Sequence, residues 1–584
     1  MKKTLLYAFC VLAFNVSSQV SAKLYPQVYD NTTINMLNEH IKNCQADTLN
    51  LCPLTAENPI ESVARSAAEQ HFPYPVIFIH GLTGSSDTWT TFYTHAINQN
   101  WTYGGWLKFC LNTDGDNSFS NITNQLSDVA DFNTNVGAAD FYLINFNTDA
   151  NGTGYGGDKT TSTLSNQAAI IKQGFALKNA IKHVLKATGK DKVILFGHSM
   201  GGLAAREYLQ NKINWQADGQ HHVVKLITSG TPHGGSNATT ANLFGDVNER
   251  SDAVRDLRRS YLYSGSQGVY LFGGIENNVT MHDFLLGDFH NTDVNCNGQT
   301  GNIVQGLNEK SISTNLDFAC IIGDWRWDLS VSNPGDGVVE VKDAQLKKFY
   351  TIRSETFNIT SSLSKRLHTQ LTSYTSDNFK ALDEPDYFHL SYTVKNNTLY
   401  NGFITPQASD AETQMDYDDY VFTLTQPQYV NISVGNIAIT DLGVSLFKSS
   451  NLLTPILTSR SENRSKFTTN SIYLTAGTYY LEIDGWANSI SWGYPYNFSI
   501  NTHTTTPTVD VQNPTLKIYP NPTNDRIYFD NLKAHTEVAI LNIYGSILKK
   551  ANYTEGGINL TDLAKGLYFL RVQGDNTVYK IIKL

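Results

Sequence analysis

The chain has 584 residues, more than one ordinary hydrophobic core accommodates, so we expect about two to four domains. Charged residues make up 16% of the sequence, below the roughly 25% usual for soluble domains, and the formal net charge is -10. No long run of Lys and Arg is present, so the composition argues against a nucleic acid partner.

The N-terminus has the pattern of a signal peptide. A basic start at residues 1–3 precedes an apolar stretch at 5–14, and residues 20–22 form a small-residue cleavage site. We therefore predict that residues 1–22 are removed on export. The alternative is a membrane anchor, but this stretch is shorter than the roughly 20 residues that cross a bilayer. No later run is long and apolar enough, so we predict no transmembrane segment in the mature chain.

The cysteines suggest little disulfide framework. The chain has 6 cysteines, and removal of the signal peptide leaves an odd number, so one thiol is unpaired or all are reduced. The pairs closest in sequence are Cys44 with Cys52 and Cys296 with Cys320. None has metal-ligand spacing, so no zinc site is expected.

Residues 23–382 alternate strand-like and helical stretches, the pattern of an α/β domain. Between two of the apolar runs, residues from Leu164 to Leu185 recur at helical spacing, and Gly189 suits the helix end. We predict a doubly wound, mostly parallel sheet with crossover helices. The runs predicted as buried parallel strands are 76–80, 141–146, 193–196, 223–228, 318–323 and 348–353.

A GxSxG motif, residues 197–201, lies between the strand-like run 193–196 and the helix-like stretch 203–209. Strand, turn and helix in this order form a nucleophile elbow. Such a turn holds its serine in a strained backbone conformation with the hydroxyl exposed. Ser199 is therefore the candidate nucleophile.

A serine nucleophile needs a base that is itself oriented by an acid, and the hydrolase chain order is Ser, Asp or Glu, then His. Asp336 lies between glycines after the run 318–323 and is the candidate acid; Asp324 and Asp328, nearer the strand end, are its competitors. His368 follows the last predicted strand of this domain and is the candidate base.

Two more motifs accompany the elbow: an HGxxG segment at 80–84 and the segment Gly-Thr-Pro-His-Gly-Gly-Ser at 230–236. Together the three motifs resemble those of bacterial lipases and related serine esterases, and the resemblance spans most of residues 70–375. It implies an α/β-hydrolase fold. It also implies an oxyanion hole made by the backbone N–H groups of Leu82 and Met200. We expect structural roles for the two motif histidines, His80 and His233.

Residues 236–314 form an insertion longer than a usual connection, and such long loops are often lids. Its apolar segments 261–263 and 270–272 suit either a lid over an acyl pocket or the packing of an extra helix.

The same insertion contains Asp293, Asn295 and Asn297, spaced like the first half of a calcium loop. Val304 replaces the Glu that an EF-hand carries at its twelfth position, so an EF-hand is excluded. An irregular calcium site and an Asn-rich turn are the two interpretations. The predicted catalysis requires no cofactor, and structural calcium is the only one the sequence suggests.

After residue 382 the sequence changes to short alternating strands rich in Tyr, Thr and Asn. The clearest are 416–424 and 474–483. Over residues 386–502 these stretches resemble the bacterial pre-peptidase C-terminal domain, which implies a β-sandwich that accompanies a secreted enzyme. That family implies calcium or a polymer as ligand, and the residues leave the choice open.

A Thr- and Pro-rich linker is predicted at 503–514. Residues 515–584 resemble the type A sorting domain of the Bacteroidetes type IX secretion system, through the segments 517–523, 566–572 and 579–584. The resemblance implies a small β-sandwich that is read by the type IX secretion machinery. A carbohydrate-binding β-module is the alternative. We expect an extracellular protein, released or attached to the cell surface.

The predicted function is that of a secreted serine ester hydrolase that works through an acyl-enzyme, as a monomer. The aromatic insertion favours lipid acyl esters, as in triacylglycerol lipases. Short-chain carboxylesterases, phospholipases and polyester hydrolases share the same motifs. The alternative of another class is a non-catalytic binding protein on a hydrolase scaffold.

Overall fold

The computed structural model divides the chain into two compact units, Met1–Thr504 and Thr505–Leu584. The predicted signal peptide, Cys44, Cys52 and linker residues 504–514 lie outside the residues that the structure describes. The described residues are 72–111, 125–154, 165–236, 251–257, 274–275, 295–299, 303–325, 334–351, 359–373, 375–405, 415–437, 442–461, 464–486, 495–503, 517–530, 532–542, 546–573 and 578–584.

The first unit begins with an eight-stranded sheet in the order β10-β9-β6-β5-β1-β4-β2-β3. Every neighbouring pair is parallel except β2 with β3, which is antiparallel. The predicted doubly wound, mostly parallel sheet is therefore confirmed. The strands are β1 (Val76–Ile79), β2 (Tyr103–Cys110), β3 (Ala130–Asp131), β4 (Phe141–Asn145), β5 (Val193–His198), β6 (Val223–Ser229), β9 (Asp317–Gly323) and β10 (Ile359–Ser364).

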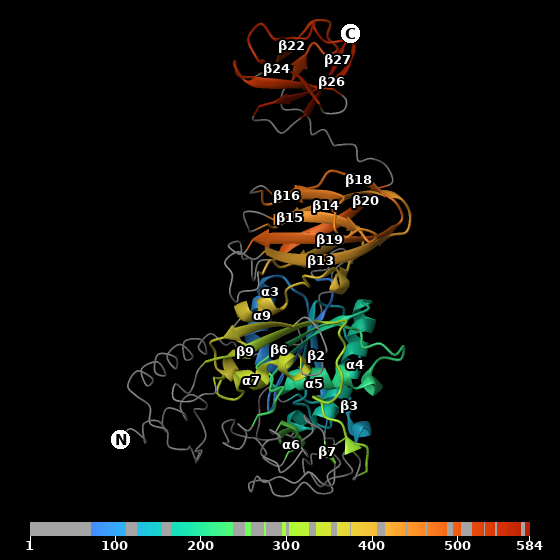
Figure 1. The fold of residues 1–584 in the computed structure, drawn as a ribbon, viewed down its shortest axis with the longest axis vertical. Helices are drawn as coiled ribbons and strands as arrows, with labels where there is room; N and C mark the ends of the chain where they lie inside the picture. Colours follow the sequence, from blue (N-terminus) through green and yellow to red (C-terminus); the bar gives the residue numbers. More distant parts are fainter. Residues whose placement is uncertain are drawn as a thin grey trace, which may run out of the picture. The chain divides into compact units, whose positions relative to one another are not determined.

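Helices cover both faces of this sheet (Figure 1). Alternate residues of a strand point to opposite faces, so Phe78 packs with α3 (Thr90–Asn98) and α9 (Thr375–Ala381). Ile77 and Leu195 face the other way and pack with α4 (Ile170–Thr188) and α5 (Met200–Gln210). The predicted end of α4 is confirmed, since Gly189 caps the helix in the left-handed conformation.

The prediction of a strand at 348–353 was wrong. This segment lies largely in the helix α8 (Leu346–Thr351), in which Leu346 and Tyr350 are buried four residues apart on one face. The last strand is β10, which forms the edge of the sheet and carries polar residues at most positions. An edge strand buries few side chains, and even Leu363 is 63% exposed. The sequence of β10 therefore has no continuous apolar run of the kind that predicts a buried strand.

The remaining helices and small strands of this region connect the sheet. Within the described ranges, no helix combines the length and the hydropathy of a membrane span. The connecting elements are η1 (Ser86–Trp89), η2 (Leu126–Asp128), η3 (Ser165–Gln167), η4 (Lys212–Asn214), α6 (Asp252–Leu257), β7 (Gly274–Ile275), β8 (Ile303–Val304), α7 (Val341–Ala344), η8 (His368–Gln370) and η9 (Phe388–Leu390).

A β-sandwich follows in the same unit. One sheet has the order β11-β13-β19-β15-β16 and the other β12-β20-β14-β17, with β18 paired to β14. The two predicted strands correspond to β13 and β19, which pair antiparallel along their lengths; β19 begins later than expected because Leu474 ends β18. The strands are β11 (Tyr392–Thr393), β12 (Leu399–Gly402), β13 (Met415–Leu424), β14 (Gln428–Gly435), β15 (Leu442–Lys448), β16 (Leu457–Arg460), β17 (Phe467–Thr468), β18 (Ile472–Leu474), β19 (Gly477–Trp486) and β20 (Tyr496–His503).

The sandwich shares a hydrophobic core with the α3 and α9 face of the sheet. The rings of Phe72 and Phe403 stack with centroids 5.5 Å apart, and Tyr74 meets Tyr392 edge-on at 5.2 Å. The Tyr74 hydroxyl also accepts a hydrogen bond from the Thr393 N–H at 3.2 Å. The eight-stranded sheet and the sandwich are therefore packed together as parts of one unit.

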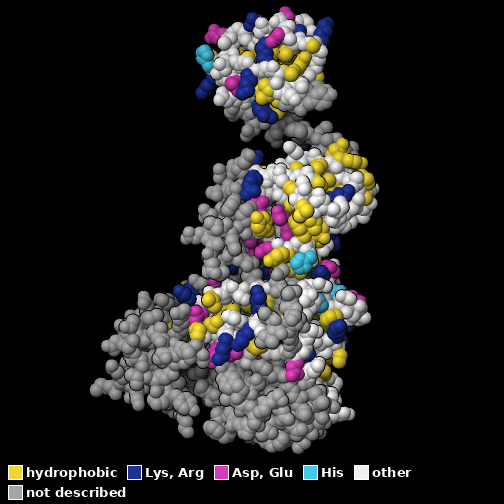
Figure 2. Space-filling view, in the orientation of Figure 1, with side chains coloured by type: hydrophobic (Ala, Val, Ile, Leu, Met, Phe, Trp, Pro, Cys, Tyr) yellow, Lys and Arg dark blue, Asp and Glu magenta, His cyan; other side chains and the backbone are white. Residues whose placement is uncertain are grey.

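The second unit is a small β-structure with its own core, which includes Ile527, Ile540 and Leu570. Its sheets have the orders β21-β22-β25 and β24-β23-β26-β27. On the face shown in Figure 2, basic and acidic side chains are intermixed on its surface. The strands are β21 (Ile518–Tyr519), β22 (Arg526–Phe529), β23 (Glu537–Leu541), β24 (Ile547–Asn552), β25 (Ile558–Asn559), β26 (Gly566–Val572) and β27 (Val578–Lys583).

Candidate active site

Ser199 lies at the sharp turn between β5 and α5, at the carboxyl end of the central strands. Its backbone has φ 54° and ψ −127°, which side chains other than glycine rarely adopt. The turn is tight enough to require glycine nearby: a Cβ on Gly201 would lie 2.6 Å from the carbonyl oxygens of Ile79 and His80. This packing holds the strained serine in place.

Ser199 and His368 are in hydrogen-bond contact although they come from different strand ends. The Ser199 Oγ is 2.8 Å from His368 Nε2. His368 follows β10, the edge strand, and its side chain is buried. The imidazole nitrogen that faces the serine is therefore positioned to accept the hydroxyl proton.

Asp336 occupies the opposite side of the same imidazole. Its Oδ2 is 2.9 Å from His368 Nδ1, so the imidazole Nδ1–H donates to the carboxylate. Its Oδ1 accepts hydrogen bonds from the backbone N–H groups of Val338 at 2.9 Å and Val339 at 2.8 Å. One carboxylate oxygen thus anchors the side chain to its loop while the other orients the histidine.

The structure distinguishes Asp336 from Asp324, one of its two competitors. The carboxylate that bonds His368 is that of Asp336. Asp336 packs against the end of β9, where a Cβ added to Gly323 would lie 2.3 Å from the Asp336 Cβ. Asp324 is bonded through its backbone N–H to the Ser364 carbonyl at 2.7 Å. Asp328 lies outside the described residues.

His198 contributes a contact that the sequence analysis did not assign. Its Nε2–H donates to the backbone carbonyl of His368 at 3.0 Å, and the two imidazole centroids are 4.8 Å apart. Burial, with the nearby His368 adding to it, lowers the pKa of His198 to about 3, so this ring stays neutral near pH 7. Its place in the GxSxG motif was the only signal that marked it, and that signal names no partner.

The HGxxG loop packs directly on the serine. A Cβ on Gly81 would lie 2.6 Å from the Ser199 Cβ and 3.2 Å from its Oγ, so only glycine allows this approach. Leu82 follows in the loop, and Met200 is the first residue of α5. Both predicted oxyanion donors are therefore in segments next to the serine, and their role remains a prediction.

His80 stabilises the HGxxG loop through two hydrogen bonds. Its Nε2 accepts the Phe146 N–H at 3.0 Å, and its Nδ1–H donates to the Gly81 carbonyl at 2.8 Å. Burial lowers the pKa of His80 to about 4, which keeps the ring neutral and able to accept. Both contacts agree with the structural role that we expected.

His233 is likewise buried in a hydrogen-bonded network. Arg206 Nη1 donates to its Nδ1 at 3.3 Å, and its Nε2 is 3.3 Å from the Thr228 hydroxyl. Burial and the neighbouring guanidinium lower the pKa of His233 well below its ordinary value. The network also ties in Asn308 and Tyr350 through Arg206 Nη2, so this loop is held from several sides.

The described part of the insertion packs the apolar residues of a short helix against the elbow. Ala253 and Leu257 of α6 form one cluster with Met200 and Leu203 of α5, and Leu82 packs against it. Met200 thus belongs to a buried hydrophobic cluster, and the Leu82 side chain packs against it. The predicted lid segments, 261–263 and 270–272, lie outside the described residues.

The calcium candidate in the insertion is only partly described. Asp293 lies outside the described residues, while Asn297 Oδ1 accepts the Gln299 N–H at 2.9 Å, as in an Asn-containing turn. The Oδ1 of Asn295 is buried and has no hydrogen-bond partner among the described residues. This segment remains a predicted site.

The suggested pairing of Cys296 with Cys320 was wrong. The two residues form no disulfide with one another. Cys296 lies in a small cluster with Ala169 and Ile171, whereas Cys320 belongs to β9 in the main core of the sheet. Proximity in sequence did not bring the two sulfur atoms together.

Two family models match parts of the chain. Residues 73–287 match the PGAP1-like alpha/beta domain, and residues 517–584 match the secretion system C-terminal sorting domain. The chain therefore carries an α/β-hydrolase domain and a sorting domain that indicates export by a type IX system to the cell surface or beyond. No curated protein matches the chain.

Solved structures resemble the chain at low identity. The lipase BlEst2 of Bacillus licheniformis in its propeptide form is 14% identical, with a TM-score of 0.30, over 88% of this chain and 94% of that one. The naproxen esterase of Bacillus subtilis is 13% identical, with a TM-score of 0.22, over 52% and 79%. The pre-peptidase C-terminal domain of a Bacillus anthracis collagenase is 18% identical, with a TM-score of 0.16, over 20% and 98%.

Proposed function

We propose that this protein hydrolyses carboxylic esters through a catalytic triad of Ser199, His368 and Asp336. The observation that carries the proposal is the continuous hydrogen-bonded series from the Ser199 hydroxyl through the His368 imidazole to the Asp336 carboxylate. A buried acid that orients a base, and a base that contacts a strained serine, is the arrangement that activates a hydroxyl nucleophile.

In this mechanism the Ser199 Oγ attacks the ester carbonyl while His368 Nε2 takes the hydroxyl proton. Asp336 holds the Nδ1–H of the ring and stabilises the imidazolium that forms. The backbone N–H groups of Leu82 and Met200 stabilise the negative charge that develops on the carbonyl oxygen by donating hydrogen bonds to it. His368 then protonates the leaving alcohol, and an acyl-enzyme remains on Ser199. Water, activated by the same histidine, releases the acid.

We further propose that the acyl group is that of a lipid, as in a triacylglycerol lipase. The support is the apolar and aromatic sequence of the insertion, whose helix α6 packs on α5 beside Leu82, because burial of each methylene of an acyl chain favours binding. Short-chain carboxylesterases, phospholipases and polyester hydrolases use the same chemistry, so the length and the alcohol part of the substrate require measurement.

The test of this function is a series of p-nitrophenyl esters with acyl chains from acetate to palmitate. We expect hydrolysis, with kcat/KM rising as the chain lengthens, because a site that accepts lipid acyl groups gains affinity with each methylene buried. A maximum at acetate would instead indicate a short-chain carboxylesterase. Phosphatidylcholine and an aliphatic polyester film test the two other ester classes. No hydrolysis of any ester above the buffer rate would favour the non-catalytic binding protein.

The sorting domain yields a prediction about location. Deleting residues 515–584 should stop export and leave the protein in the periplasm, because the type IX machinery then has no signal to read. The deleted unit has its own core, so the remaining unit should still fold. Immunoblots of medium, cell surface and periplasm measure the outcome, and esterase activity of the retained protein is the control for folding. Unchanged export would contradict the assignment.

Comparing medium with cell surface for the full chain also shows whether the enzyme is released or attached.

A further inference from the structure

The candidate base comes from the edge of the sheet, whereas the serine comes from its centre. In the strand order β10-β9-β6-β5, Ser199 follows β5 and His368 follows β10, so β6 and β9 lie between them. The loop after β10 therefore reaches across two strand ends before His368 Nε2 lies 2.8 Å from the Ser199 Oγ. This distance matters for catalysis, because a misplacement of about 1 Å can cost about a hundredfold in rate.

Hydrogen bonds from two other strand ends hold the backbone of His368. Its N–H donates to the Asp336 carbonyl at 3.1 Å, which ties the histidine to the loop of the acid. Its carbonyl accepts the Nε2–H of His198 at 3.0 Å, which ties it to the last residue of β5. The same carbonyl accepts the Leu371 N–H at 3.4 Å, a longer contact within its own turn. His198 thus links the strand of the nucleophile to the backbone of the base.

The surroundings of His198 make it a fixed and neutral donor. A carbonyl only accepts, so Nε2 carries the proton of this ring. The other nitrogen, Nδ1, is buried and has no hydrogen-bond partner in the described part of the chain. The indole of Trp89 packs edge-on against the ring, with centroids 6.4 Å apart. Neutrality matters because the imidazole centroids of His198 and His368 are 4.8 Å apart, and a second cation there would oppose the imidazolium that forms on His368.

We propose that His198 is a positioning residue for the proposed ester hydrolysis, on which this inference rests. Its Nε2–H holds the backbone of His368 and thereby sets the distance between the imidazole Nε2 and the Ser199 hydroxyl. His198 directly precedes Ser199 in the chain, so a movement of the elbow carries the nucleophile and the donor that holds the base together. The serine and the histidine of the triad therefore keep their spacing although they come from separate strand ends.

The experiment replaces His198 with leucine, asparagine and glutamine and measures kcat, KM and Tm on the best p-nitrophenyl ester. The glutamine Nε2 is as many bonds from Cβ as the histidine Nε2 and can donate to the same carbonyl, whereas the asparagine nitrogen is one bond closer to the backbone and leucine has no donor. We expect His198→Leu and His198→Asn to lower kcat by about 10- to 100-fold with little change in KM. His198→Gln should retain most of the wild-type kcat.

A second measurement needs no substrate. Crystal structures of the wild type and the variants give the distance between Ser199 Oγ and His368 Nε2. This distance should lengthen in His198→Leu and stay near 2.8 Å in His198→Gln. An unchanged distance in His198→Leu, or a kcat equal to that of the wild type, would overturn the proposal. If His198→Leu does not fold, His198→Asn is subject to the same two criteria.

His183→Leu is the matched control, because His183 bonds Asp131 of β3, at the opposite edge of the sheet from β10. It should leave kcat unchanged. Equal losses of kcat in all three variants of His198, glutamine included, would indicate a packing role and overturn the proposal as well. Absence of ester hydrolysis by the wild type would refute the proposed function, whereas the distances in the crystal structures would still decide the role of His198.

Discussion

Replacing Ser199 with alanine is expected to remove ester hydrolysis, with kcat falling by about 10⁶-fold, the scale measured when a triad nucleophile is deleted from a serine hydrolase. The reason is that alanine cannot form the acyl-enzyme, while its small side chain occupies the same space in the turn. The measurement is kcat/KM on the best p-nitrophenyl ester, together with Tm to show that the fold is intact.

Ser127→Ala, at an exposed serine, is the control for this substitution and should leave kcat unchanged. A fluorophosphonate probe supplies an independent readout, because it should label the wild type and the control covalently but not Ser199→Ala. Activity of Ser199→Ala equal to that of the wild type would refute Ser199 as the nucleophile. Labelling of another residue in place of Ser199 in the wild type would also refute Ser199 as the nucleophile.

Asp336→Asn is expected to lower kcat by about 10⁴-fold with little change in KM, as amide replacement of a triad acid does in other serine hydrolases. The carboxamide oxygen can still accept the two backbone N–H groups of Val338 and Val339. The carboxamide nitrogen then faces His368 and donates instead of accepting, which favours the wrong imidazole tautomer. Steady-state kinetics on the same ester measure the effect.

Asp324→Asn is the matched comparison, because Asp324 was the competing acid, lies at the end of the same strand and is also buried. Its carboxylate is not the one that bonds His368, so kcat should change by less than tenfold. Losses of equal size in the two variants would contradict the assignment of Asp336 as the acid of the triad.

Local features of the fold were predictable because they depend on neighbours in sequence. The helix that ends at Gly189 shows the 3.6-residue spacing of apolar side chains and a glycine stop. The central strands are buried on both faces and are therefore continuous apolar runs. The edge strand β10 is polar at most positions and lacks such an apolar run. The prediction therefore placed the last strand on the segment that forms α8.

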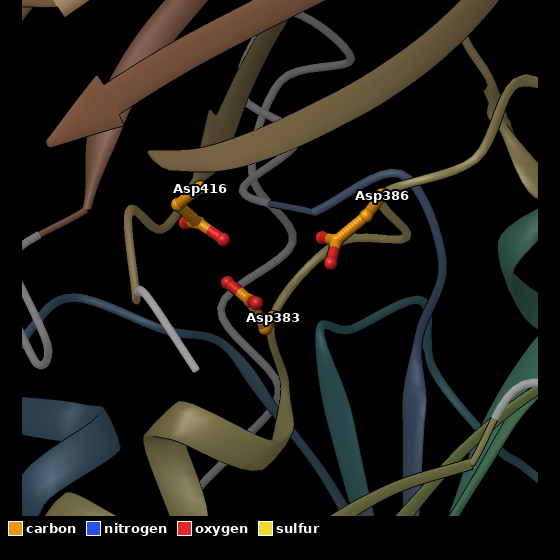
Figure 3. Close-up of side chains that lie close together, drawn as sticks. All are labelled: Asp383, Asp386 and Asp416. Carbon is orange, nitrogen blue, oxygen red and sulfur yellow. The ribbon is translucent and has the colours of Figure 1, made fainter. Parts of the chain in front are cut away.

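The sequence by itself determined the serine at its elbow, the alternation of central strands and helices, and the candidates Asp336 and His368 through the chain order of hydrolases. Tertiary structure alone decided which aspartate bonds the histidine and that His198, 170 residues away, bonds its carbonyl. It also decided that three aspartates from the two sides of a domain junction, labelled in Figure 3, lie together. The physical reason is that periodicity and turn residues report local conformation, whereas hydrogen bonds between strand ends and buried charge clusters arise only when distant segments pack.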